Sequence, residues 1–117
     1  MLKGLGGLGG LGDMAKMMKS AQEMQGKLAA LQEELGRTVV LGESGGGVVK
    51  ARVTAKGGVT GLDIDPSLLD PAQKEVVEDL ILAAIRDGQM RGNERAQTEM
   101  ARIAEEMGLP PGMSLPG

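Results

Sequence analysis

Alternation between apolar and polar residues along the middle of the chain predicts strands with one dry face and one wet, charged face. In the first such stretch, basic and hydroxyl residues alternate with four small apolar residues: Val49, Ala51, Val53 and Ala55. In the next, Leu62 and Ile64 alternate with Asp63 and Asp65. Both stretches therefore read as half-buried strands.

Turn signals separate these strands and fix their arrangement. Gly57-Gly58 joins the two, and Asp65-Pro66 ends the second. Residues 38–41 form another predicted strand, followed by a glycine turn at 44–47. Because the connections are too short for parallel crossovers, we expect a three-stranded antiparallel meander.

A helix is predicted before the sheet, from an Asp13 cap to about Leu35, with Gly36 as its stop. Its apolar residues recur at alternating steps of three and four: Met14, Met17, Ala21, Met24, Leu28, Leu31 and Leu35. So narrow a seam favours pairing with another helix over packing on a broad core. The pattern leaves open whether that helix belongs to the same chain or to another copy.

A second helix is predicted after the sheet, from Asp70-Pro71 to about Met107, or about 55 Å if unbroken. Its apolar side turns by roughly 100° near Gly88 and Gly92, so its two halves face different partners. We expect the first half to cover the sheet and the second to extend beyond it, with a bend or a close approach at the glycines.

One small α+β domain accounts for most of the chain, since 117 residues leave room for no more. Residues 1–12 are rich in glycine and leucine and predict a flexible tail, with a membrane-touching or partner-seeking arm as the alternative. Residues 13–107 form the predicted domain. Residues 108–117 contain prolines and predict an extended tail.

The residue types that the chain lacks exclude most catalytic chemistry. It has no His, Cys, Phe, Tyr or Trp, hence no imidazole base, thiol nucleophile, usual zinc ligands or stacking platform for unpaired bases. Asp63 and Asp65 share a strand face, but Lys50 and Arg52 opposite them favour ion pairs over a metal or acid–base site. We expect no enzyme activity, cofactor, metal or small-molecule substrate.

No membrane span is expected either, because the longest apolar run, residues 80–85, is far shorter than a bilayer helix. The sequence therefore favours a soluble protein of the cytoplasm.

Charge is divided unevenly along the chain, although its net value is only −3. Residues 1–56 carry eight Lys or Arg against five Asp or Glu, whereas residues 57–117 carry five against eleven. Scattered amines suit sequence-independent phosphate contact better than base readout. For the arginines of the second helix, the favoured interpretation is ion pairing with glutamates of the same helix. The alternative is a row of guanidinium groups that lines a cleft.

Three segments together resemble the YbaB/EbfC family of bacterial nucleoid-associated proteins: residues 19–25, residues 45–71 and residues 78–85. Residues 109–112, Leu-Pro-Pro-Gly, fit the usual ending of that family. The resemblance implies an α-β-β-β-α subunit in a tweezer-like homodimer. It also implies binding of duplex DNA with modest sequence preference, a cytoplasmic, nucleoid-associated location and no enzymatic activity. The chain departs from the family pattern at residues 86–93, where two glycines argue against a rigid second helix.

Two sets of candidate site residues follow. The predicted DNA contacts are basic residues of the tail and the two helices: Lys3, Lys16, Lys19, Lys27, Arg91, Arg95 and Arg102. The predicted dimer interface is the seam from Met14 to Leu35, with the sheet as the other place for it. The leading hypothesis is a dimeric DNA-binding protein of low specificity, and the alternative is a dimeric protein–protein interaction adaptor with incidental DNA binding.

Overall fold

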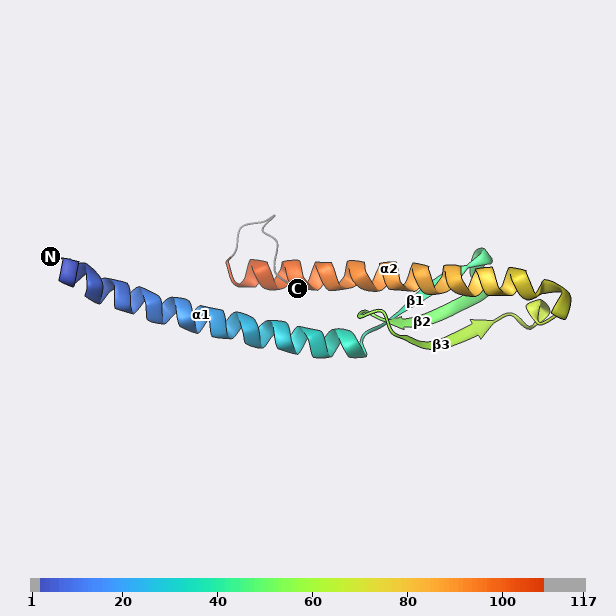
Figure 1. Cartoon of the computed structure of the whole chain (residues 1–117), viewed down its shortest axis with the longest axis horizontal. Coiled ribbons are helices and arrows are strands. Elements are labelled where there is room, and N and C mark those ends of the chain that lie inside the picture. The colour runs from blue at the N-terminus through green and yellow to red at the C-terminus, as the bar shows by residue number, and fades with distance from the viewer. Residues whose placement is uncertain (1–2, 109–117) are drawn as a thin grey trace.

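The computed structural model describes residues 3–108 of the chain, and side chains from residue 11 onward. Helix α1 (Lys3–Arg37) precedes strands β1 (Val39–Ser44), β2 (Val49–Thr54) and β3 (Val59–Ile64), and helix α2 (Lys74–Glu106) follows them. The sheet lies at one end, and both long helices extend away from it in the same direction (Figure 1). The molecule measures 83 × 22 × 18 Å. The predicted α+β class and α-β-β-β-α order are confirmed.

The three strands form the predicted antiparallel meander, with β2 in the centre. Strand β1 continues to Ser44, three residues past the predicted end at Leu41. The sequence does not predict this extension because it contains Gly42, and glycine usually weakens a strand. In the structure, Gly42 pairs with Ala51 of β2. The turn after β1 runs through Gly45, Gly46 and Gly47 with φ angles of 59°, 74° and 96°, a region that residues with a Cβ rarely enter.

The first half of α2 covers the dry face of the sheet, as its apolar side predicts. Val49, Ala51 and Val53 of β2 are fully buried against Ala84. Leu80, Ile81 and Ile85 are among the half-buried side chains packed around this cluster. The prediction that these β2 residues share a buried face is confirmed.

Three glycines bring α2 and the sheet unusually close together. A Cβ on Gly42 would lie 2.1 Å from the carbonyl oxygen of Ala84, and one on Gly88 would lie 2.5 Å from Cγ2 of Val53. A Cβ on Gly92 would lie 3.0 Å from Cα of Ala55. Helix α2 is continuous from Lys74 to Glu106. Its two glycines therefore allow close approach to the sheet and do not interrupt the helix.

The second half of α2 packs on α1 instead of the sheet. Leu31 and Leu35 are 4% and 3% exposed, and with Ala55 they form a second core cluster. Three α2 side chains at helical spacing pack against it: Ala96, Met100 and Ile103. For this end of the α1 seam, the helical partner is therefore in the same chain.

The helix starts differ from the predicted ones. Helix α1 begins at Lys3 and not at Asp13, so residues 3–12, expected to form a tail, are helical. A helix grows by one hydrogen bond per added residue once it is nucleated, so the strong helix formers after Asp13 can extend it through the glycines. Helix α2 begins at Lys74, after a 3₁₀ turn, Pro71–Gln73, in which the Asp70 carboxylate accepts a hydrogen bond from the Ala72 amide at 2.9 Å. The tail predicted for residues 108–117 lies outside the described residues from 109 onward.

Because of the close approach at Gly88, replacing this glycine by alanine should destabilise the protein, although alanine has the higher helix propensity. Gly88→Ala should lower the free energy of unfolding by about 1–3 kcal/mol, because the methyl group meets Val53. Gly26→Ala in α1, where nothing lies within 4 Å of an added Cβ, should instead stabilise the protein by about 0.5–1 kcal/mol. Urea denaturation measures both, and equal gains in the two variants would refute the close approach.

Candidate nucleic-acid interface

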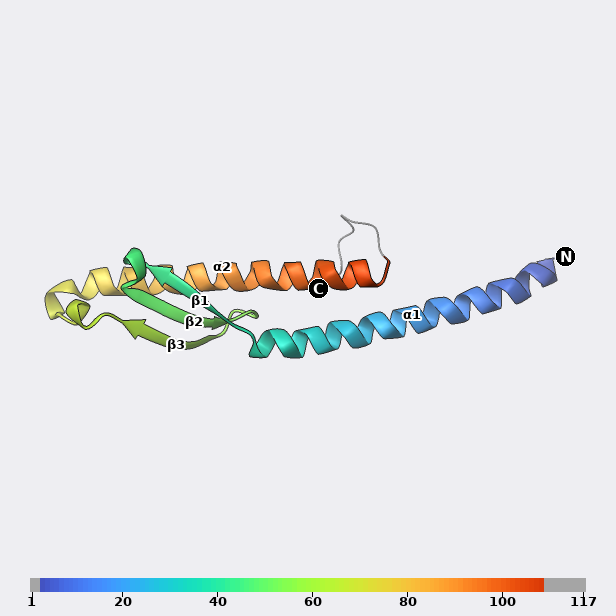
Figure 2. The ribbon, with the colours of Figure 1, turned by 180° about the vertical axis from the view of Figure 1, so that it is seen from behind.

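Two lysines of α1 are the candidate cations that remain unengaged. Lys16 and Lys19 are exposed, and neither forms an ion pair among the described side chains. Both precede Lys27, which pairs with the last residue of α2, and Figure 2 shows that the N-terminal part of α1 projects beyond the end of α2. Lys3 belongs to the same helix, but its side chain lies outside the described ones. This part of α1 therefore offers two exposed ammonium groups that no carboxylate among the described side chains holds in an ion pair.

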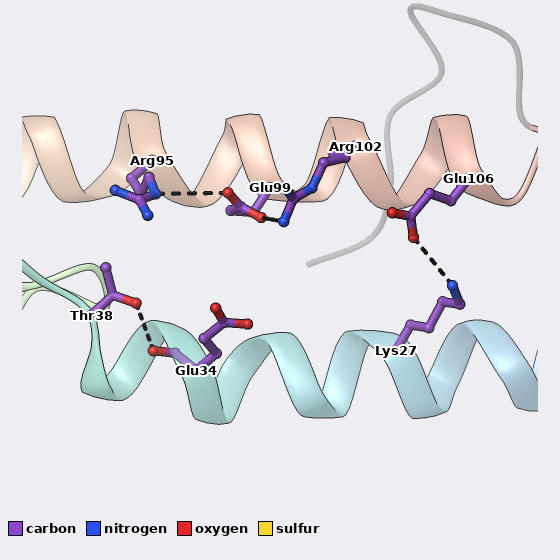
Figure 3. Close-up of polar contacts among 7 residues, drawn as sticks. All are labelled: Lys27, Glu34, Thr38, Arg95, Glu99, Arg102 and Glu106. Carbon is purple, nitrogen blue, oxygen red and sulfur yellow. Dashed lines mark hydrogen bonds and ion pairs between the residues drawn. The ribbon is translucent and has the colours of Figure 1, made fainter.

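The three arginine candidates of α2 form ion pairs within their own helix. Arg91 Nε lies 3.0 Å from Asp87 Oδ2, and Arg95 Nε lies 3.7 Å from Glu99 Oε1. Arg102 pairs through Nη2 with the other carboxylate oxygen of Glu99. Figure 3 shows Glu99 held between the two arginines on α2. Pairing within the helix, the favoured interpretation of these residues, is thus what the structure contains.

Lys27 is engaged as well, across the gap between the helices. Its Nζ lies 3.2 Å from Glu106 Oε2, which links α1 to the last residue of α2 (Figure 3). Beside this bridge lies a cleft of about 180 Å³, lined by residues that include Glu34, Glu99 and Arg102. Both signs of charge line it, so the cleft offers a polyanion no continuous positive surface.

The arginines do not form one row along a single cleft. Arg102 lines the cleft between the helices, whereas Arg91 and Arg95 line a shallow groove of about 510 Å³ beside β1, with Val40 and Leu41. The alternative interpretation was a row of guanidinium groups lining one cleft. The three arginines instead lie on two different surfaces.

The wet face of the sheet holds one of the expected ion pairs. Arg52 Nη1 lies 2.8 Å from Asp63 Oδ2. Asp65 instead accepts hydrogen bonds from the backbone amide and hydroxyl of Ser67 at 2.9 and 2.8 Å, and these bonds lower the pKa of its carboxyl. In the part of the chain that the structure describes, no three residues are grouped as metal ligands would be.

Sequence reasoning missed a second basic place, where α1 meets the sheet. Arg37 ends α1, and Cδ of Lys56 lies 3.5 Å from the position that a Cβ of Gly36 would take. Both residues are exposed, and neither forms an ion pair among the described residues. Two strands, β1 and β2, separate them in the sequence, and only the fold of the meander brings them near each other.

The predicted seam divides into a covered part and an open part. Leu31 and Leu35 are buried against α2, Met24 and Leu28 are half-buried, and Ala21 is exposed. The remaining seam residues, Met14 and Met17, are 59% and 70% exposed. Two further apolar residues that the seam did not include are also exposed there, Leu11 and Met18.

The helices were also compared with the requirements of a membrane span. Neither α1 nor α2, over the residues that the structure describes, is long and apolar enough to cross a bilayer.

Comparison with known proteins identifies the family. The sequence profile of the YbaB/EbfC DNA-binding family matches residues 10–107, so the chain belongs to this family. A nucleoid-associated protein of Rhodospirillum rubrum is 44% identical over 98 residues, which cover 84% of this chain and 92% of the relative. A nucleoid-associated protein of Bradyrhizobium is 47% identical over 94 residues, covering 80% and 89% of the two chains.

A solved structure shares the fold. The crystal structure of an uncharacterised protein of Helicobacter pylori superimposes with a TM-score of 0.63 at 25% sequence identity, over 74% of this chain and 91% of the other. The family implied by the sequence resemblance is confirmed by the profile match and by the two relatives. It is a family defined by DNA binding and not by a reaction.

Asp87 of α2 is hydrogen-bonded to the backbone of β1, and this contact predicts that the stability of the protein depends on pH. Its Oδ2 accepts hydrogen bonds from the Glu43 amide at 2.9 Å and from Arg91 Nε at 3.0 Å, and these hold the pKa of the carboxyl below its ordinary 3.8. Because the folded pKa is the lower one, the stabilisation is complete above the unfolded pKa and disappears as the pH falls through the folded pKa. Asp87→Asn should therefore cost about 1 kcal/mol at neutral pH, and its difference from the parent should vanish in acid.

Urea unfolding between pH 7 and pH 2 measures that difference, with Asp79→Asn, an exposed position on the same helix, as the control. A penalty for Asp87→Asn that stays constant down to pH 2 would contradict the assignment.

Proposed function

We propose that this chain binds duplex DNA as a homodimer with little dependence on base sequence, and that it acts as a nucleoid-associated protein of the cytoplasm. The observation that carries the proposal is the projecting end of α1, where Lys16 and Lys19 are exposed and form no ion pair among the described side chains. Membership of the YbaB/EbfC DNA-binding family supports the same ligand.

On the projecting end of α1, low specificity follows from the type of cation available there, which is lysine. Lysine ammonium groups act as point charges on phosphate, whereas bidentate reading of guanine commonly uses arginine. Arg95 and Arg102 are held by Glu99, so reading a base would first require breaking these pairs. The free lysines instead provide contacts to the phosphate backbone, which carry no sequence information by themselves.

Self-association is supported by the large exposed surface of the chain. Its accessible area is 7963 Å², whereas a compact monomer of 12.1 kDa would expose roughly 6000 Å². Only eight hydrophobic residues are classed as buried among the described ones. Covering part of the excess surface in a dimer would supply stability that this small core does not.

We place the dimer contact at strand β3, the edge strand of the sheet that α2 does not cover. Leu62 pairs with Ala51 and so lies on the face that α2 covers, yet it is 38% exposed because α2 packs mainly over β1 and β2. Val59 of the same strand is 44% exposed. An open edge strand with uncovered apolar side chains is a ready template for pairing with another strand, and a second β3 would extend the sheet.

Charge reversal on the arm tests the DNA contact. Lys16→Glu with Lys19→Glu should weaken binding to a duplex at least tenfold in a gel-shift titration at low salt, because each change removes a phosphate contact and adds a repulsion. Lys74→Glu, an exposed lysine at the far end of α2, serves as the control and should change affinity much less. Equal losses in the two proteins would mean that α1 is not the contact surface.

The dimer surface is tested by a charge on β3. Leu62→Asp should convert the protein to monomers in size-exclusion chromatography with light scattering, because the carboxylate would be desolvated at the contact. Met90→Asp, at a side chain 56% exposed on α2, should leave the dimer intact. A Leu62→Asp protein that stays folded and dimeric would place the interface elsewhere.

A further inference from the structure

An apolar patch on the projecting end of α1 has no partner in the described chain. Leu11, Met14, Met17 and Met18 are 62%, 59%, 70% and 62% exposed, and they lie within eight residues of one helix. Scattered exposed apolar residues are ordinary on a protein surface, but a contiguous cluster on one helix marks an interaction site. We call these four residues the arm-tip patch.

The patch continues an interface that the structure already contains. Met14 and Met17 occupy the same seam as Leu31 and Leu35, which α2 covers. Helix α2 ends at Glu106, beside Lys27, so the seam is left open towards the N-terminus. The same stripe that binds one helix in its covered part therefore presents a vacant helix-packing surface at the tip.

The patch is complementary to itself. In an antiparallel pair of α1 helices with the two-fold axis at the level of Ala15, Met14 lies within one residue of the level of Met17 of the second copy. Leu11 likewise lies within one residue of the level of Met18 of the second copy. The four exposed residues of one copy then lie opposite the same four residues of the other. Thioether side chains are flexible enough to fill such a contact without exact shape matching.

The charges of the arm agree with a second copy as the occupant. Lys16 and Lys19 lie on the opposite side of the helix from the seam, as the heptad positions require. They would therefore not meet their counterparts in the contact. The pairing also leaves both ammonium groups facing solvent, where phosphate can reach them.

We propose that the arm-tip patch is a second self-association surface, through which one dimer binds the next by antiparallel pairing of α1 tips. The inference rests on the proposed function, in which the primary dimer forms at β3. The tip and β3 are well separated along the long axis of the molecule (Figure 1). Two separate two-fold contacts on one chain allow assemblies larger than a dimer: a closed one, such as a tetramer, when the two axes intersect, and an open, linear one when they do not.

Binding to DNA would make this weak contact effective. Four side chains per copy form a small interface, well below the area of stable complexes. Neighbouring dimers on one duplex are held at high effective concentration, so a contact too weak to persist in dilute solution can act there. The expected consequence is cooperative binding on long duplexes and independent binding on short ones.

The experiment uses the full chain and the double variant Met14→Gln with Met17→Gln, which changes no charge and keeps good helix formers. The matched control is Met90→Gln, an equally exposed methionine on α2. Gel-shift titrations on a duplex that accommodates one dimer and on one several times longer are combined with light scattering of the free proteins. The short duplex reports the proposed function alone, and the difference between the two duplexes reports the tip contact.

The parent and Met90→Gln should bind the long duplex cooperatively and form species larger than a dimer at high concentration. Met14→Gln with Met17→Gln should stay dimeric and bind the short duplex with unchanged affinity, but lose both the cooperativity and the larger species. Non-cooperative binding by the parent, or unchanged cooperativity in the double variant, would overturn the inference. Conversion of the double variant to monomers would also overturn it, since the tip would then be the primary dimer contact.

Discussion

The contact on which the rest of the molecule depends is the close approach of α2 to β1 and β2. Gly42 and Gly88 remove the side chains that would separate backbone from backbone, and Ala84 and Val53 fill what remains. This contact fixes the direction in which α2 leaves the sheet. Its second half consequently lies over Leu31 and Leu35 of α1, so a single helix holds both the sheet and the arm in place.

The end of α2 determines which part of α1 is free. Lys27 and Glu106 pair where the two helices part, and the arm projects alone beyond them (Figure 2). The carboxylates of Asp87 and Glu99 form ion pairs with Arg91, Arg95 and Arg102 of α2. Lys16 and Lys19 of α1, in contrast, form no ion pair among the described side chains. Packing and charge thus assign the same segment of α1 to contact with partners, with lysines on one side and apolar residues on the other.

Much of this fold could be predicted from the sequence because its signals are local. Alternation set the buried face of β2, and the change of apolar side in α2 predicted two different packing partners. The glycines of α2 could not be resolved into bend or close approach, because that depends on Val53 and Ala55, more than 30 residues away. The start of α1 was predicted too late because glycine propensity was weighed without the helix that follows it.

The candidate site was less predictable than the fold. The seven cations could be selected by type and helical position, but their pairing depends on side-chain geometry, which separates free Lys16 from engaged Lys27. Arg37 and Lys56 escaped notice because no sequence pattern joins the end of a helix to a distant turn. The seam was recognised as a helix-pairing surface, but the sequence did not show that α2 covers only one end of it.

The most direct test of electrostatic, sequence-independent binding is the salt dependence of affinity for two duplexes of unrelated sequence. The account predicts parallel lines of log affinity against log salt, each with a slope of about −0.9 per phosphate neutralised. The lines should nearly coincide, since phosphate contacts do not distinguish the sequences. An affinity that stays constant between roughly 50 and 200 mM salt, or a large offset between the two duplexes, would contradict it.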